Sequence, residues 1–253
     1  MVSDNDKAHF NQRGYVTLKN VFNSEELNVF NEWDGFDEKH NNKSHLVINP
    51  SPKQIIDIQN IFKKPILVDF SSFALKAKHK VSLIELAVTA PENNVAGDDG
   101  SLFKFGFCKA NGIGVHRDGG WIDRDLNIDF PPMLTLKAAI WLTDISSSQG
   151  NMRVFDGSHA MSTNDIQELN INKAIYTDIT ANVGDVTFFD RRLLHTRTWN
   201  RSGCTRKVLF VEYSVTWIKR KQYMGIMAHQ SIDEICNLSP VLELSEPWGN
   251  YWP

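Results

Sequence analysis

The chain has 253 residues and a formal net charge of −3 at pH 7, so it is long enough for one large domain with a substantial core. The small negative charge excludes a general affinity for nucleic acid or for anionic membranes. No apolar run approaches the ~18 residues that cross a bilayer, and the N-terminus lacks the apolar core of a signal peptide. We therefore expect a cytoplasmic protein. Its three cysteines include no CxxC pair and predict neither a disulfide framework nor a thiolate zinc site.

The first third of the chain predicts mainly helix. Residues 15–18, Tyr-Val-Thr-Leu, predict a short strand. Residues 23–26, Asn-Ser-Glu-Glu, match a capping box and predict the start of a helix that carries Leu27, Phe30 and Trp33 on one buried stripe. The polar residues 36–52 predict a loop, and residues 53–79 predict further helix. We expect a helical layer, about residues 1–80, that braces a sheet.

From residue 81 onward the pattern changes to short apolar runs separated by Gly, Asn and Pro. Turn residues at intervals of roughly 8 to 12 are typical of a β-sandwich or barrel. The runs that predict strands are residues 81–88, 102–108, 131–145, 152–158, 174–181, 186–189 and 208–218, with a helical patch near 164–173. We expect a single domain over residues 1–253, with a β core at about 81–217 and a C-terminal extension at 218–253.

Two distant motifs carry potential metal ligands. His116 and Asp118 flank Arg117, and on an extended segment residues i and i+2 point to the same face, so they can hold one ion while Arg117 points away. His195 follows GDVTFFDRRLL, in which a Gly-Asp turn starts an apolar strand, and is the expected third ligand. Two imidazoles and one carboxylate leave coordination positions open, as in non-haem Fe(II) sites that activate O2. The absence of a cysteine ligand disfavours structural zinc.

Arg206 opens the next predicted strand after His195. A guanidinium inside a barrel needs a partner, and the natural one is a carboxylate such as the far end of 2-oxoglutarate. The alternative is an exposed turn residue. His159 is interpreted as a structural residue or one that supports the ligands. Surface or ordinary core positions are predicted for His9, His40, His45, His79 and His229.

In their order and spacing these motifs resemble the phytanoyl-CoA dioxygenase (PhyH-like) family of Fe(II)/2-oxoglutarate-dependent oxygenases. The matching segments are residues 14–27, 115–120, 138–159 and 184–214. The resemblance implies a mainly β fold, a double-stranded β-helix (a cupin-like jelly roll) with flanking N-terminal α-helices. It also implies Fe(II) held by His116, Asp118 and His195, 2-oxoglutarate bound by Arg206, and O2 as co-substrate. Candidates for a second 2-oxoglutarate contact, with packing or surface roles as the alternative, are Lys109, Thr135 and Trp141.

The implied reaction is hydroxylation, or another oxidation, of a small-molecule substrate, with decarboxylation of 2-oxoglutarate to succinate and CO2. The carboxylate of Asp118 favours this over halogenation, because related halogenases carry a small residue in its place. Two alternatives stay open. One is a non-catalytic jelly-roll protein that binds a small ligand, and the other is a cupin-like isomerase or hydrolase.

The sequence indicates less clearly which residues contact the substrate. Loops at residues 91–101 and 119–132 are expected to shape it, and Trp121, Arg124, Phe130 and Arg192 are candidate substrate contacts, with loop packing as the alternative. An excess of arginine near the ligands favours an anionic substrate, although arginines at strand ends are commonly solvated or paired. These arginines are Arg117, Arg191, Arg192 and Arg197. Both a monomer and a homo-oligomer fit the sequence.

Overall fold

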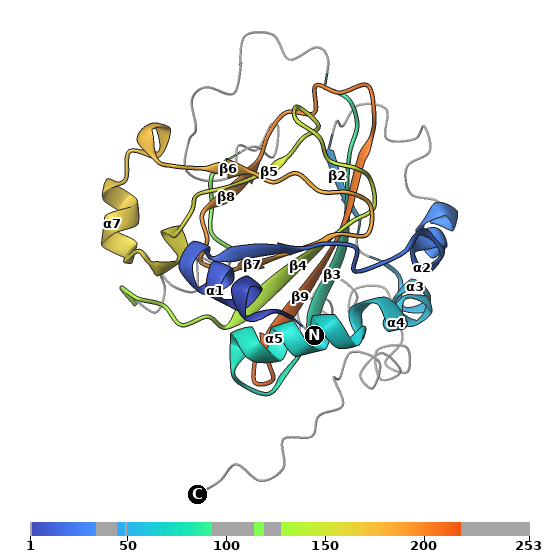
Figure 1. Cartoon of the computed structure of the whole chain (residues 1–253), viewed down its shortest axis with the longest axis horizontal. Helices are drawn as coiled ribbons and strands as arrows, with labels where there is room; N and C mark the ends of the chain where they lie inside the picture. The colour runs from blue at the N-terminus through green and yellow to red at the C-terminus, as the bar shows by residue number, and fades with distance from the viewer. Residues whose placement is uncertain (1, 34–44, 49, 93–113, 119–127, 219–253) are drawn as a thin grey trace, which may run out of the picture.

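Two antiparallel sheets face one another across the interior of the molecule (Figure 1). The computed structural model describes residues 2–33, 45–48, 50–92, 114–118 and 128–218. Within them the large sheet runs in the order β1 (Tyr15–Leu18), β7 (Val186–Asp190), β4 (Thr135–Trp141), β9 (Arg206–Val215), β3 (His79–Thr89) and β2 (His45–Ile48). The small sheet has the order β6 (Thr177–Asp178), β5 (Met152–Val154) and β8 (His195–Arg197). This is the mainly β, jelly-roll architecture that was expected.

Most of the helices precede the core strands, as predicted. They are α1 (Asp4–Arg13), α2 (Ser24–Leu27), the 3-10 helix η1 (Asn28–Glu32), α3 (Pro52–Asp57), α4 (Gln59–Phe62) and α5 (Pro65–Leu75). Three short helices lie between β5 and β6, namely η2 (Ser158–Ala160), α7 (Thr163–Glu168) and η3 (Ile171–Lys173). Helix α5 lies along the outer face of the large sheet (Figure 1).

Strand β4 shows how the large sheet separates core from site. Its side chains alternate between the two faces of the sheet. Leu136 and Ile140 belong to the core that α5 covers, whereas Ala139 and Trp141 belong to a second cluster inside the barrel. Lys137 shares the inner face and lines a cavity there. An ionisable side chain at this position therefore points toward the interior.

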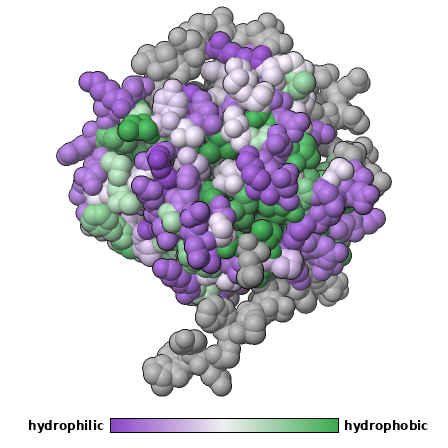
Figure 2. Space-filling model, viewed as in Figure 1, coloured by the Kyte–Doolittle hydropathy of each residue, from purple (hydrophilic) through white to green (hydrophobic). Residues whose placement is uncertain are grey.

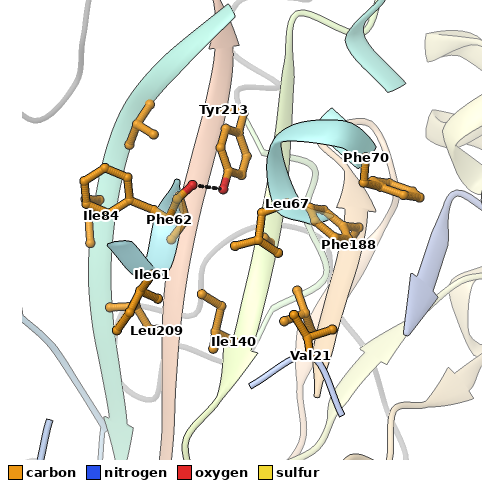
Figure 3. Packing of buried hydrophobic residues seen from close by; sticks show 14 of the residues in the cluster. Val21, Ile61, Phe62, Leu67, Phe70, Ile84, Ile140, Phe188, Leu209 and Tyr213 are labelled. Carbon is orange, nitrogen blue, oxygen red and sulfur yellow. Dashed lines mark hydrogen bonds between the residues drawn. The ribbon is translucent and has the colours of Figure 1, made fainter. Parts of the chain in front are cut away.

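Aromatic and aliphatic side chains fix α4 and α5 on the sheet (Figure 3). Phe70 of α5 stacks on Phe188 of β7 with a ring centroid distance of 4.3 Å. Tyr213 of β9 is fully buried, and its hydroxyl donates to the Phe62 carbonyl at 2.8 Å. The hydrogen bond satisfies a polar group that would otherwise be costly in this apolar layer.

The N-terminal third differs from the prediction in detail. The capping box at Asn23 is present, with the Glu26 amide 3.0 Å from its Oδ1, but the α-helix it starts ends at Leu27 and continues as 3-10 helix. Helix α1 and strand β2 were not expected, because α1 is polar apart from buried Phe10 and β2 lies within a polar stretch. The predicted strand at 102–108 and the C-terminal extension from 219 lie outside the described residues.

The exposed face shown in Figure 2 is mainly hydrophilic along its outline, with hydrophobic residues between. In the described part of the chain, every helix is too short or too polar to span a bilayer.

Candidate active site

The three predicted metal ligands meet between the two sheets. His116 and His195 form an isolated antiparallel bridge in which each backbone amide donates to the other residue's carbonyl at 3.0 Å. Asp118 is anchored through its own amide, which donates to the Arg191 carbonyl at 2.9 Å. Val115 and Leu194, the residues just before the two histidines, are buried in one small apolar cluster. The backbone thus holds both histidines side by side, with their ring centroids 4.4 Å apart.

The donor atoms of this triplet lie close enough to hold one ion. One atom each from His116, Asp118 and His195 lies within 4.8 Å of the others. His116 Nε2 is 4.0 Å from Asp118 Oδ1, and His195 Nε2 is 3.8 Å from Asp118 Oδ2. Two nitrogens and a carboxylate oxygen are a donor set that suits a divalent transition metal, so the residues present fit such an ion.

Both imidazoles have one ring nitrogen engaged by backbone. His116 Nδ1 lies 2.8 Å from the Gly114 carbonyl, and His195 Nδ1 lies 2.9 Å from the Leu193 carbonyl. A carbonyl can only accept, so each Nδ1 carries the proton and each Nε2 keeps a lone pair for a metal. Burial and the neighbouring His116 lower the pKa of His195 to about 4, against the opposing effect of Asp118. His195 is therefore neutral at pH 7, as a ligand must be.

The carboxylate of Asp118 faces a cation from the opposite sheet. Lys137 Nζ lies 3.1 Å from Asp118 Oδ2. Burial alone would raise the pKa of Asp118, but Lys137 and the two imidazoles outweigh burial and hold that pKa below its usual range. Asp118 is ionised at neutral pH and available to a metal.

These groups open onto a cavity of about 300 Å³. Its walls combine the metal-ligand triplet with charged and apolar side chains from both sheets. They include Val47, Leu83, Glu85, Ala87, Lys137, Met152, Phe189, Thr196, Arg197, Arg206 and Phe210. A small molecule of about the size of a dicarboxylate with a second ligand fits a space of this order.

Arg206, at the start of β9, is the predicted co-substrate arginine and lines the same cavity. It is 2% exposed, and its guanidinium makes no hydrogen bond to a described residue. The ring centroid of Trp141 lies 5.3 Å from the guanidinium carbon. Burial and the nearby Arg197 lower the pKa of Arg206 to about 9, with Glu92 opposing. A buried guanidinium that makes no hydrogen bond to a described residue would be stabilised by a bound anion.

Arg197 is a second guanidinium on the cavity wall. It follows His195 by two positions on β8, so both side chains point inward. Unlike Arg206, it is held by two hydrogen bonds to Glu92, at 2.8 and 2.9 Å. Glu92 also accepts from the Asn200 amide at 2.8 Å. Glu92 thus neutralises Arg197 from behind the cavity lining, and Arg206 remains to meet a ligand.

The three candidates for a second 2-oxoglutarate contact differ in their positions relative to the cavity. Lys109 lies outside the described residues. Thr135 is buried at the far end of β4 and does not line the cavity, so the structure gives it no role there. Trp141 is fully buried and donates from Nε1 to Thr187 Oγ1 at 2.9 Å, so it supports Arg206 rather than the ligand space.

The predicted substrate contacts need correction. Trp121 and Arg124 lie outside the described residues. Phe130 is 67% exposed and does not line the cavity. Arg192 points elsewhere, because its guanidinium binds Asp190 and donates to the Pro131 carbonyl at 2.9 Å. We retain neither Phe130 nor Arg192 as a substrate contact.

The arginines clustered near the metal ligands bind protein groups and do not indicate an anionic substrate. Arg117 points away from the metal ligands, as predicted, and donates to the Ser158 and Met161 carbonyls. Arg191 donates to the Pro132 carbonyl. Together with the partners of Arg192 and Arg197 described above, these contacts tie the cluster into the scaffold.

The histidines interpreted as structural have structural contacts where they are described. His159 Nε2 lies 3.2 Å from the Asn11 carbonyl, and its ring lies against Gly14. His79 Nε2 lies 2.8 Å from Ser71 Oγ, and His9 packs edge-on against Tyr15.

Sequence reasoning missed Lys137 and Glu92. Lys137 could have been found, because it is the one ionisable residue in the apolar run LTLKAAIW. Glu92 gave no comparable signal, since its contact with Arg197 joins positions 105 apart in the chain.

The sequence matches the model of a known protein family. The model of the family described as phytanoyl-CoA dioxygenase (PhyH) matches residues 10–208. This range includes the metal-ligand triplet and Arg206. No curated protein is significantly similar in sequence.

Several solved structures share the fold. The carbocyclase SnoK from nogalamycin biosynthesis, described as non-heme and alpha-ketoglutarate-dependent, is 16% identical with a TM-score of 0.60, covering 91% of both chains. HygX from Streptomyces hygroscopicus, with nickel, 2-oxoglutarate and hygromycin B bound, is 16% identical with a TM-score of 0.59, covering 87% of this chain and 90% of HygX. EctD from S. alaskensis, with 2-oxoglutarate and 5-hydroxyectoine, is 18% identical with a TM-score of 0.57, covering 85% of this chain and 76% of EctD. At these identities the likeness establishes the jelly-roll fold.

Proposed function

Because the chain belongs to the phytanoyl-CoA dioxygenase family, we propose that it uses Fe(II), 2-oxoglutarate and O2 to hydroxylate, or otherwise oxidise, a small-molecule substrate. One observation carries the proposal. A metal-binding triplet and a buried guanidinium without a hydrogen-bond partner among the described residues line one cavity. A metal site alone would serve many reactions, whereas the added cation requires an anionic ligand within the same space.

In this proposal His116, Asp118 and His195 hold the iron. The bound metal and co-substrate supply the oxidising chemistry, in which O2 is consumed and 2-oxoglutarate is decarboxylated to succinate and CO2. The protein presents the Nε2 atoms of two imidazoles, whose Nδ1 atoms are engaged by backbone carbonyls, and one ionised carboxylate. Three protein ligands leave positions open for other molecules.

Arg206 binds the far carboxylate of 2-oxoglutarate. Its guanidinium fork can donate two parallel hydrogen bonds to a carboxylate, and burial makes each stronger than it would be in water. Glu92 neutralises Arg197, so the two guanidiniums and one carboxylate leave a single positive charge at this end of the cavity. One unpaired positive charge matches one carboxylate.

Apolar side chains would exclude water around the reacting atoms. Met152, Phe189 and Phe210 line the same cavity as the metal ligands and Arg206. Exclusion of water by these side chains strengthens the electrostatic contacts of bound groups and limits side reactions. The structural neighbour SnoK is named as a carbocyclase, so reactions other than hydroxylation are also compatible with this fold.

The test is succinate release from 2-oxoglutarate in air with Fe(II) and ascorbate, across a library of small acids, amino acids, aminoglycosides and acyl thioesters. The proposal expects substrate-stimulated succinate in the wild type and none in His195→Ala. An anaerobic titration of Fe(II) and 2-oxoglutarate should give a metal-to-ligand absorption band. Absence of both the band and succinate would favour a non-catalytic ligand-binding protein. Turnover without O2 and 2-oxoglutarate would favour an isomerase or hydrolase.

A further inference from the structure

A cation from the large sheet stands beside the carboxylate ligand. Lys137 comes from the middle of β4, whereas Asp118 and the two histidines lie on the other side of the cavity. Its Nζ is 3.1 Å from Asp118 Oδ2, and both side chains are only 14% exposed. The ammonium thus forms an ion pair with the Oδ2 atom of the carboxylate.

Other groups hold the ammonium in place. Glu212 and Glu85 attract it from β9 and β3. Glu212 is itself fixed by the Ser82 hydroxyl, which donates to Glu212 Oε1 at 2.7 Å. The ring centroid of Phe210 lies 5.7 Å from the ammonium. Burying a lysine is costly, and this one is stabilised by acids on the two strands beyond β4 as well as by Asp118.

The number of oxygens that Asp118 offers decides how many coordination positions stay open. A carboxylate can bind a metal through one oxygen or through two. Two histidines and a one-oxygen carboxylate fill three of six positions, whereas a two-oxygen carboxylate fills four. A co-substrate that chelates through two atoms would then leave no position open.

On the premise of the proposed function, we infer that Lys137 is a positioning residue that restricts Asp118 to one-oxygen ligation. By holding Oδ2, the ammonium keeps a coordination position available. It also places a positive charge near the metal, so it weakens metal binding relative to an uncharged neighbour. Lys137 therefore lowers the affinity of the site for the metal but keeps one coordination position of the metal open.

This role predicts an unusual pair of effects for Lys137→Met. The variant should bind Mn(II) more tightly, because it loses a repelling charge and frees the second oxygen. At an effective dielectric constant of about 20, removing a unit charge this near a divalent ion changes affinity by roughly tenfold or more. The same variant should bind 2-oxoglutarate roughly tenfold more weakly, because the chelate competes with the freed oxygen. A purely structural role would weaken the binding of both.

The experiment measures the anaerobic Kd of Mn(II) by electron paramagnetic resonance, and then the Kd of 2-oxoglutarate in the Mn(II)-loaded protein. Lys137→Gln is the second neutral variant and should show the same tightening of Mn(II). Lys137→Arg keeps the charge and should stay near the wild-type value. Lys80→Met is the matched control, since it removes a lysine of β3 whose ammonium contacts the Thr216 carbonyl instead. Circular dichroism checks that each variant is folded.

Unchanged or weaker Mn(II) binding in the folded neutral variants, or an unchanged Kd of 2-oxoglutarate in Lys137→Met, would overturn the inference. This failure is distinct from failure of the proposed function. If the wild-type protein binds neither Mn(II) nor 2-oxoglutarate, the proposed function is wrong. If the wild type binds both and the neutral variants do not tighten Mn(II), only the role of Lys137 is wrong.

Discussion

Replacing Arg206 by Met should weaken 2-oxoglutarate binding and, at the same time, stabilise the ligand-free protein. The guanidinium is 2% exposed and donates no hydrogen bond to a described residue, so without a ligand it is a desolvated charge. Its pKa is lowered to about 9 by burial and by Arg197. Because this folded-state pKa lies below its ordinary value, the charged form destabilises the fold at every pH below about 9.

The two effects can be estimated separately. Removing one partner of a desolvated charge pair costs about 3 kcal/mol, so the Kd of 2-oxoglutarate should rise roughly a hundredfold. Removing an uncompensated buried charge should return on the order of 2 kcal/mol to the ligand-free protein. In a chain of this size that corresponds to a rise in Tm of about 4–8 °C.

Thermal unfolding with and without 2-oxoglutarate, in the presence of Mn(II) and absence of O2, measures both. At a hundredfold excess over Kd, the co-substrate should stabilise the wild type by about 2.7 kcal/mol. The same concentration should barely move Arg206→Met. Arg206→Lys keeps the charge but loses the fork, and should fall between the two. A Met variant with a lower ligand-free Tm and an unchanged 2-oxoglutarate Kd would refute the reasoning.

Three further predictions concern the metal ligands and the turn before β7. His195→Ala should lose Mn(II) binding by equilibrium dialysis while its far-UV circular dichroism stays native; retained stoichiometric binding would remove it from the ligand set. Gly184→Ala should cost at least about 3 kcal/mol in denaturant unfolding, because its φ is +87° and a Cβ would lie 2.1 Å from the Phe22 carbonyl oxygen; a loss below about 1 kcal/mol would contradict that geometry. Burial alone would raise the pKa of Asp185, but hydrogen bonds from the Asn182 amide and Lys19 lower it, so its stabilising effect should be complete above about pH 4 and lost as pH falls further. Asp185→Asn should cost about 2 kcal/mol at pH 7 and flatten this acid limb of the stability curve; an unaltered limb would assign it to other carboxylates.

The clustering of His116, Asp118 and His195 was predictable from the sequence pattern around each residue. The alternation of an extended segment places His116 and Asp118 on one face, and His195, at the start of β8, supplies the third group. The same alternation would have indicated Lys137, whose neighbours in β4 are apolar. Local spacing was sufficient for each of these positions.

The partner of Arg197 was not predictable, because the contact with Glu92 joins positions 105 apart in the chain. Arg197 and Arg192 look alike in the sequence, yet Arg197 lines the cavity and binds Glu92, whereas Arg192 does not line it and binds the nearby Asp190. Short elements were also missed. Strand β2 owes its existence to pairing with β3, which its own polar surroundings do not reveal. Tertiary pairing overrides local propensity in such cases.

Strand β1 has consequences for how the chain folds during synthesis. It forms the edge of the large sheet next to β7, where the hydroxyls of Thr17 and Thr187 lie 2.9 Å apart although they are 170 positions apart in the sequence. At translation rates of about 5–20 residues per second, roughly 10 to 30 s pass before the partner strand exists. During that interval β1 lacks its partner strand, and the sheet against which α5 packs is incomplete. Completion of this fold is therefore a late event, set by the emergence of β7 and β9 from the ribosome.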